Sequence, residues 1–195
     1  KSIRKAFPKA EISVDTFRSG IVKKAYDAIG PFMVNDISAG NLDGEMLRTV
    51  GQMDLPYIAM HMRGTPVTMM ALAQYTDVVE AVKAYFHEFR LKAQDEGVRE
   101  WILDPGFGFA KTREQSFELL SRLHELKELG RPILAGLSRK SMIYKTLDID
   151  PEDALPGTQV LQFKALEEGA TLLRVHDVEE AARTVKLFEA LGNNS

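Results

Sequence analysis

The feature that most constrains this chain is a strict alternation of short apolar runs with longer amphipathic stretches. Six such runs recur at intervals of roughly 20 to 40 residues, at 12–15, 31–36, 55–62, 101–105, 132–137 and 171–176. A short, continuously apolar segment is typical of a strand that is buried on both faces. Six β/α repeats in sequence predict a parallel sheet with crossover helices, and both a doubly wound open sheet and a (β/α)8 barrel fit that pattern.

Helices are predicted between the runs. Residues 77–96 carry apolar side chains at helical spacing, and Thr112 with Gln115 has the spacing of a capping box, which predicts a helix from there to about Leu129. Further signals of helix starts and ends are Gly130, Asp150-Pro151, Asp177 with Glu180, and Gly192.

Composition narrows the class of protein. The chain has 195 residues, of which 45% are hydrophobic, and this predicts one globular domain over residues 1–195. A net charge of −3 and the absence of an apolar run of about 18 residues argue against nucleic-acid and membrane partners. The chain has no Cys, which excludes thiolate chemistry and suits the cytoplasm, and its four His show no spacing of metal ligands, so no metal site is predicted from these residues.

Polar or ionisable residues follow every predicted strand. In parallel α/β folds the ligand crevice lies at the carboxyl ends of the strands, so a set of six such endings favours a binding site there. The endings are Asp15-Thr16, Asn35-Asp36, His61-Met62-Arg63, Asp104, Ser138-Arg139-Lys140, and Arg174 with His176 and Asp177.

Each of these residues also has a structural interpretation. Asp15 could cap the following helix, and Asn35 and Asp36 could be turn residues. Arg139 could belong to a charged surface loop, and His61 could be a hydrogen-bonded histidine without a functional role.

Two positions favour a ligand more strongly. Asp104 is followed by a tight loop containing Phe107 and Phe109, and aromatic rings beside an acid indicate a bound flat ring. Arg174 and His176 are two residues apart, so on a strand their side chains would share one face, where two cations need an anion.

Together these residues describe a possible ligand. The carboxylates of Asp15 and Asp104 and the amide of Asn35 can bind the edge of a ring that carries donors and acceptors. Arg174 and His176 would bind a phosphate at some distance from the ring, with Lys140 between.

The ordered set of motifs resembles dihydropteroate synthase, a pterin-binding TIM-barrel family, over essentially the whole chain. The motifs are Ser13-Val14-Asp15-Thr16, Asn35-Asp36-Ile37, Met60-His61-Met62-Arg63-Gly64-Thr65-Pro66, Asp104-Pro105-Gly106-Phe107-Gly108-Phe109, Gly136-Leu137-Ser138-Arg139-Lys140 and Arg174-Val175-His176-Asp177.

The resemblance implies strands 3–8 of a TIM barrel and an enzyme of folate biosynthesis, the target of sulfonamides. That family condenses dihydropterin hydroxymethyl pyrophosphate with p-aminobenzoate to 7,8-dihydropteroate and pyrophosphate in an SN1-like step, with Mg2+, and tends to form homodimers. The catalytic residues it implies are Asp15, Asp104, Lys140, Arg174 and His176. The implied pterin residues are Asp15, Asn35, Ile37, Met60, Asp104, Phe109, Gly136 and Lys140. Arg174 and His176 match the pyrophosphate site, and Phe109, Lys140 and Ser141 the p-aminobenzoate site.

One departure from the family bears on activity. The family has eight strands and this chain has six, so the first two, with the loops that help to order Mg2+ and p-aminobenzoate, are expected to precede Lys1. The chain alone is therefore expected to be weakly active at best. Two alternatives are a pterin-dependent methyltransferase domain, against which the Ser-Arg-Lys and Arg-Val-His-Asp motifs argue, and an inactive pterin-binding fragment.

Overall fold

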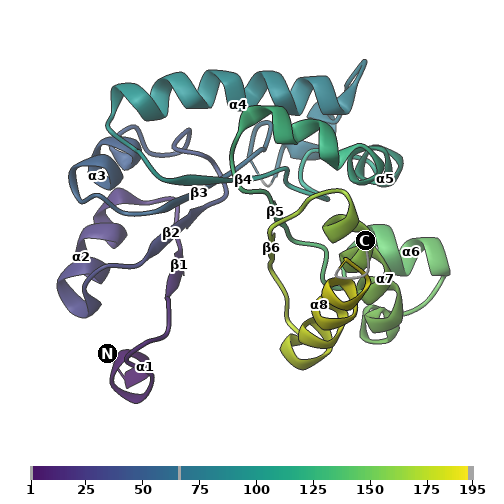
Figure 1. Ribbon diagram of the computed structural model, residues 1–195. Helices are drawn as coiled ribbons and strands as arrows, with labels where there is room; N and C mark the ends of the chain where they lie inside the picture. The colour runs from purple at the N-terminus through teal and green to yellow at the C-terminus, as the bar shows by residue number, and fades with distance from the viewer. Residues whose placement is uncertain (1, 66, 193–195) are drawn as a thin grey trace. The chain divides into compact units, whose positions relative to one another are not determined.

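All six predicted strands are present in the computed structural model, which describes residues 2–65 and 67–192 (Figure 1). Each strand is shorter than the apolar run that predicted it, by one residue at β1 and β4 and by two or more at the other strands. The strands are β1 Ser13–Asp15, β2 Met33–Asp36, β3 Tyr57–Met60, β4 Trp101–Asp104, β5 Leu134–Ala135 and β6 Leu172–Leu173.

Helices occupy the segments between the strands, as predicted. The α-helices are α1 Ser2–Ala6, α2 Ser19–Ile29, α3 Met46–Gln52, α4 Val78–Asp95, α5 Arg113–Ser121, α6 Ser141–Leu147, α7 Leu155–Glu167 and α8 Val178–Gly192. The short 3-10 helices are η1 Met69–Leu72, η2 Leu123–Leu129 and η3 Pro151–Asp153.

The capping box is confirmed, but the single helix to Leu129 is wrong. The Thr112 side chain accepts from the backbone N–H of Gln115, and the Gln115 side chain accepts from the N–H of Thr112. The α-helix ends at Ser121, and a 3-10 segment continues to Leu129 before Gly130, whose φ of 63° ends it in the left-handed region.

The chain divides into two compact units, and the prediction of one domain stays a prediction. The first unit comprises Lys1–His61 and Ala84–Leu103. Strands β1 to β4 form a sheet in chain order, and the β1–β2 and β2–β3 pairings are parallel, with Asp15 opposite Asn35. Helix α4 covers this sheet through an aromatic cluster in which Phe89 stacks on Tyr57 at 5.9 Å and Phe86 stacks on Trp101 at 6.1 Å.

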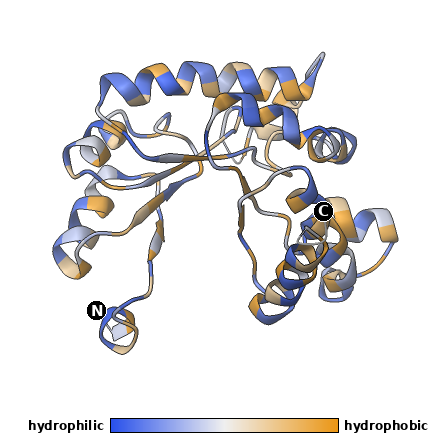
Figure 2. Cartoon of the chain, in the orientation of Figure 1, coloured by the Kyte–Doolittle hydropathy of each residue, from blue (hydrophilic) through white to orange (hydrophobic). Residues whose placement is uncertain are grey.

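The second unit comprises Met62–Lys83 and Asp104–Ser195. Strands β5 and β6 pair in parallel, and Figure 2 shows both as largely hydrophobic. Helices α6 and α7 approach closely at Gly157, where an added Cβ would lie 2.6 Å from the Cγ2 atom of Ile143. Among the described residues, no helix is both long enough and apolar enough to span a bilayer.

Candidate active site

In the first unit, the ends of β1 and β2 bring together Asp15 and Asn35. Parallel pairing sets them opposite each other, and the Asn35 amide nitrogen donates to Asp15 Oδ1 at 2.8 Å. Asn35 is buried, whereas Asp15 is exposed. The alternative that Asp15 caps the next helix is wrong: helix α2 follows Arg18, and Asp43 accepts the Ser19 backbone N–H at 2.7 Å.

Asp36, which follows Asn35, has a structural role. Its fully buried carboxylate accepts from the Ser38 N–H (2.8 Å), the Ser38 hydroxyl (2.7 Å), the Gly40 N–H (2.9 Å) and the Tyr57 hydroxyl (2.6 Å). These four bonds satisfy a charge that would otherwise be costly to bury. They also fix the turn that contains the half-buried Ile37.

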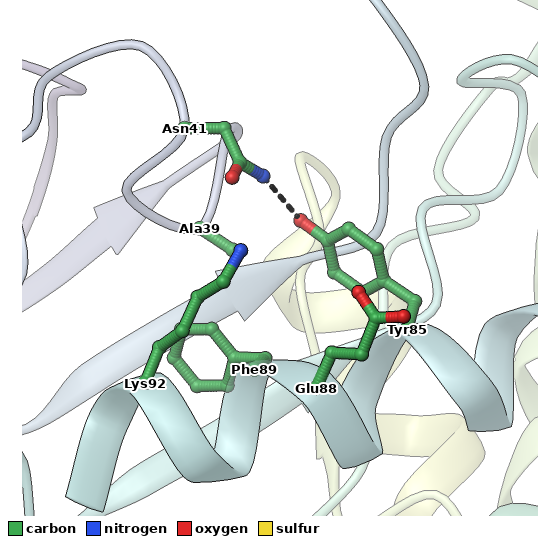
Figure 3. Close-up of a pocket in the computed structure, with 6 residues that line it drawn as sticks. All are labelled: Ala39, Asn41, Tyr85, Glu88, Phe89 and Lys92. Atoms are coloured by element: carbon green, nitrogen blue, oxygen red, sulfur yellow. Dashed lines mark hydrogen bonds between the residues drawn. The ribbon is translucent and has the colours of Figure 1, made fainter. Parts of the chain in front are cut away.

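The end of β3 is buried. Met60 and His61 are 3% and 1% exposed, and the His61 ring meets the Tyr85 ring edge to face at 4.8 Å. Burial raises the pKa of Tyr85, whose hydroxyl receives a hydrogen bond from the Asn41 amide at 3.2 Å. That bond crosses a surface pocket of about 10 Å³, large enough for roughly one water (Figure 3). None of the residues predicted to bind ligand lines this pocket.

In the second unit, Asp104 ends β4 at the start of the Gly-Phe-Gly-Phe loop. Its side chain is 8% exposed overall, and Oδ1 accepts from the Gly106 N–H at 2.8 Å. Burial raises the pKa of Asp104. Four neighbours lower it: the charge of Lys140, the hydrogen bond from the Gly106 N–H, and the charges of Lys111 and Arg174. The site therefore surrounds a buried carboxyl group with positive charge.

Lys140 lies beside the same loop, at the N-cap position of α6. Its ammonium donates to the Phe107 carbonyl and lies 5.0 Å from the centre of the Phe109 ring. Burial lowers its pKa to about 8, Asp104 opposes that shift, and Arg174 adds to it. Ser141, the first residue of α6, is exposed.

The two phenylalanines of the loop have different roles. Phe107 is fully buried, so it anchors the loop to the core and cannot contact a ligand, contrary to the prediction that both rings flank one. Phe109 is half-buried and already carries a cation near its face.

Lys111 is a member of this cluster that the sequence did not reveal. It is 2% exposed, and its ammonium donates to the carbonyls of Gly106 and Phe109, both at 3.1 Å. Burial lowers its pKa to about 7; Asp104 raises it, whereas Lys140 and Arg63 lower it further. A lysine just before a helix is normally expected to have a solvated side chain. The only sequence signal for Lys111 is its place two residues after the Gly-Phe-Gly-Phe loop.

Arg174 and His176 follow β6 instead of lying on it. The predicted strand over 171–176 is wrong in extent, because pairing with β5 ends at Leu173, although the Arg174 N–H still donates to the Ala135 carbonyl at 3.0 Å. Both residues are exposed, so the argument from burial on a strand face does not apply. Gly136 lies next to Arg174: a Cβ added there would be 3.9 Å from the Arg174 Cβ.

Arg139 has the structural role that was considered for it, as part of a charged loop. Nε and Nη2 each donate to one oxygen of Asp177 at 2.9 Å, which makes a bidentate pair, and Nη1 donates to the Pro151 carbonyl at 3.2 Å. This pair ties the segment after β5 to the start of α8. It also gives the Asp177 carboxylate a structural partner.

Each unit thus carries part of the predicted set. The first holds Asp15, Asn35, Ile37 and Met60, and the second holds Asp104, Phe109, Gly136, Lys140, Ser141, Arg174 and His176. In the second unit the buried Asp104 carboxylate, the buried Lys111 ammonium, the half-buried Lys140 and the face of the Phe109 ring come together around the loop after β4. Such a group can bind a flat ring that donates N–H bonds and accepts others.

Comparison with known proteins gives consistent results. The family described as "Pterin binding enzyme" matches residues 1–176. A dihydropteroate synthase from Synechocystis is 44% identical over 92% of this chain and 63% of its own length. The chain therefore spans less than two thirds of that relative.

Solved structures agree in fold. Dihydropteroate synthase from Thermus thermophilus in complex with 4-aminobenzoate is 37% identical, with a TM-score of 0.88 over 93% of this chain and 71% of that one. The enzyme from Yersinia pestis with a sulfonamide drug complex is 30% identical, with a TM-score of 0.94 over 100% and 70%. These neighbours confirm the predicted fold class, an α/β chain that corresponds to part of a TIM barrel.

Proposed function

Since the chain belongs to the pterin-binding enzyme family, we propose that it carries the active site of a dihydropteroate synthase of folate biosynthesis. The reaction condenses dihydropterin hydroxymethyl pyrophosphate with p-aminobenzoate to 7,8-dihydropteroate and pyrophosphate. The observation that carries the proposal is the buried Asp104 carboxyl group. It lies near the charges of Lys140 and Lys111, and Lys140 also lies beside the half-buried ring of Phe109.

The pterin is proposed to bind mainly to residues of the second unit. The Asp104 carboxylate would accept N–H bonds from the amino-pyrimidinone edge, because a carboxylate can accept two parallel bonds. Lys140 would donate to a ring acceptor, and the Phe109 face would contact the ring. Asp15, Asn35, Ile37, Met60 and Gly136 complete the proposed pterin set.

The reaction then needs charge stabilisation more than a nucleophilic residue. The bond between the pterin methylene carbon and the pyrophosphate oxygen breaks, and its electron pair leaves with the pyrophosphate. Arg174 and His176 would stabilise that developing charge, where preorganised cations contribute most. The amine of p-aminobenzoate, held near Phe109, Lys140 and Ser141, donates its lone pair to the carbon and loses a proton.

Mg2+ is proposed as the cofactor, and it would be held mainly through the pyrophosphate and the family's first loop, not by residues of this chain. Within the part of the chain that the structure describes, no group of three or more His, Cys, Asp or Glu side chains could hold a metal ion.

The proposed setting is a homodimer in the cytoplasm. The surface of α8 supports a partner copy, because Leu187 and Leu191, four residues apart, are 66% and 65% exposed. A chain without cysteine is suited to a reducing compartment.

Calorimetric titration with dihydropterin hydroxymethyl pyrophosphate tests the proposal. We expect Asp104→Asn to weaken binding by about tenfold or more, because hydrogen bonds to a charged group contribute about 1.5–3 kcal/mol. Asp150→Asn is the matched control, since Asp150 is exposed and its side chain does not cap a helix. Equal affinity of the parent and Asp104→Asn would contradict the assignment, and a pyrophosphate-release assay with p-aminobenzoate separates turnover from binding alone.

A further inference from the structure

Lys111 is a buried cation that the reaction described above does not use. Only 2% of it is exposed, yet a lysine side chain is among the costliest to bury. Its ammonium is compensated by the carbonyls of Gly106 and Phe109, each at 3.1 Å. Those two carbonyls belong to the loop that carries the proposed pterin residues.

Both bonds lead directly to a proposed ligand-binding side chain. Gly106, whose carbonyl accepts from Lys111, also donates its backbone N–H to Asp104 Oδ1 at 2.8 Å. The Phe109 carbonyl fixes the backbone of the residue whose ring lies 5.0 Å from the Lys140 ammonium. The ammonium of Lys111 therefore joins the two parts of the loop that orient Asp104 and Lys140.

The loop needs such support because its backbone is unusual. Gly106 and Gly108 have φ of 69° and 76°, and Ala110 has φ of 48°, a left-handed conformation that is sterically unfavourable for a residue with a Cβ. The Tyr75 hydroxyl supports the same segment by donating to the Ala110 carbonyl at 2.9 Å. Bonds from the buried Lys111 and the half-buried Tyr75 thus stabilise a turn that the backbone alone disfavours.

We propose that Lys111 is a positioning residue for pterin binding, because its ammonium fixes the 106–109 loop in the conformation that orients Asp104 and Lys140. This inference rests on the proposed function, since Asp104 and Lys140 matter only if they bind the pterin. Lys111 itself acts through the loop and touches no substrate. An apolar side chain of similar length would fill the same space but would remove the ammonium donor from both carbonyls, and the Gly106 carbonyl would keep its bond from the Phe109 N–H at 3.0 Å.

The test is a double-mutant cycle measured by calorimetric titration with dihydropterin hydroxymethyl pyrophosphate. Lys111→Met is expected to raise Kd about tenfold in the parent but less than about threefold in an Asp104→Asn background, because there the aligned carboxylate is already lost. Lys186→Met, at an exposed lysine of α8, is the matched control and should leave Kd unchanged. Thermal unfolding of every variant verifies that it is folded.

The outcomes separate the inference from the proposed function. A folded Lys111→Met that binds like the parent, or loses the same factor in both backgrounds, would overturn the positioning role alone. A parent that does not bind would overturn the proposed function and this role with it. If Lys111→Met does not fold, Tyr75→Phe is the second variant, because it removes a weaker support of the same loop. We expect it to raise Kd about threefold in the parent and to leave Kd unchanged in the Asp104→Asn background. An unchanged Kd in the parent would refute the inference.

Discussion

At the residue scale, the side chains that the sequence revealed are those whose chemistry stands out from their surroundings. An acid, two glycines and two phenylalanines in a row were enough to single out Asp104, and Lys140 followed a buried run. Lys111 could not be found in this way, because its burial depends on carbonyls that only the folded loop brings to it. For the same reason the bidentate pair that occupies Arg139 was not predictable from spacing.

The charges of this loop predict how pterin affinity depends on pH. Burial raises the pKa of Asp104 above the ordinary 3.8, so the ionised acceptor is lost on acidification at a higher pH than for an exposed aspartate. Burial lowers the pKa of Lys140 to about 8, so its charge is lost as the pH rises through that value. We therefore expect affinity to be highest between these two limits and to fall on both sides.

Calorimetry at a series of pH values checks this profile. Asp104→Asn should remove the acidic limb. Lys140→Met should remove the part of the alkaline limb near pH 8 and leave the part at lower pH, because burial lowers the pKa of Lys111 to about 7 and its charge is lost there. An alkaline limb that is unchanged in Lys140→Met would show that Lys140 does not contribute to it.

At the element scale, the sequence predicted the start of helix α5 better than its end. Starts depend on local chemistry, as in the reciprocal bonds of Thr112 and Gln115. Ends depend on neighbours: α5 changes to a 3-10 helix at Leu123, where Leu123, Leu126 and Leu129 all turn into the core. Strand β6 likewise ends at Leu173, since its partner β5 extends only to Ala135.

The capping box gives a prediction of stability. Thr112→Ala removes the acceptor for the Gln115 N–H and should lower the free energy of unfolding by about 0.5–2 kcal/mol. Urea denaturation followed by circular dichroism measures the change. Thr76→Ala, at an exposed threonine, is the control, and a similar loss there would mean that the cap contributes nothing specific.

At the scale of the whole molecule, alternation of strands and helices established an α/β chain but not its closure. A doubly wound sheet and a barrel share that alternation, because both are built from the same right-handed β/α unit. The family motifs indicated the barrel, and the solved relatives confirmed it over 93% to 100% of the chain. What the periodicity could not supply is the arrangement of ligand residues that come from different repeats.

The exposed face of α8 predicts the state of assembly. If Leu187 and Leu191 contact a second copy, sedimentation equilibrium should give twice the mass of one chain, and Leu187→Asp should give a monomer, because a charge would then be buried without a partner. Lys186→Glu, a charge change on the same helix at an exposed lysine, serves as the control. A monomeric parent would contradict the proposed dimer.

The burial of Phe107 has a consequence for the timing of ligand exchange. Because this ring is fully enclosed, the loop after β4 can open only if Phe107 leaves the core, which costs about 1.5–3 kcal/mol of apolar burial. The loop is then open for only about one tenth to one hundredth of the time. Pterin should therefore enter and leave mostly while the loop is closed, and its residence time should be set by the bonds it breaks and not by the motion of a lid.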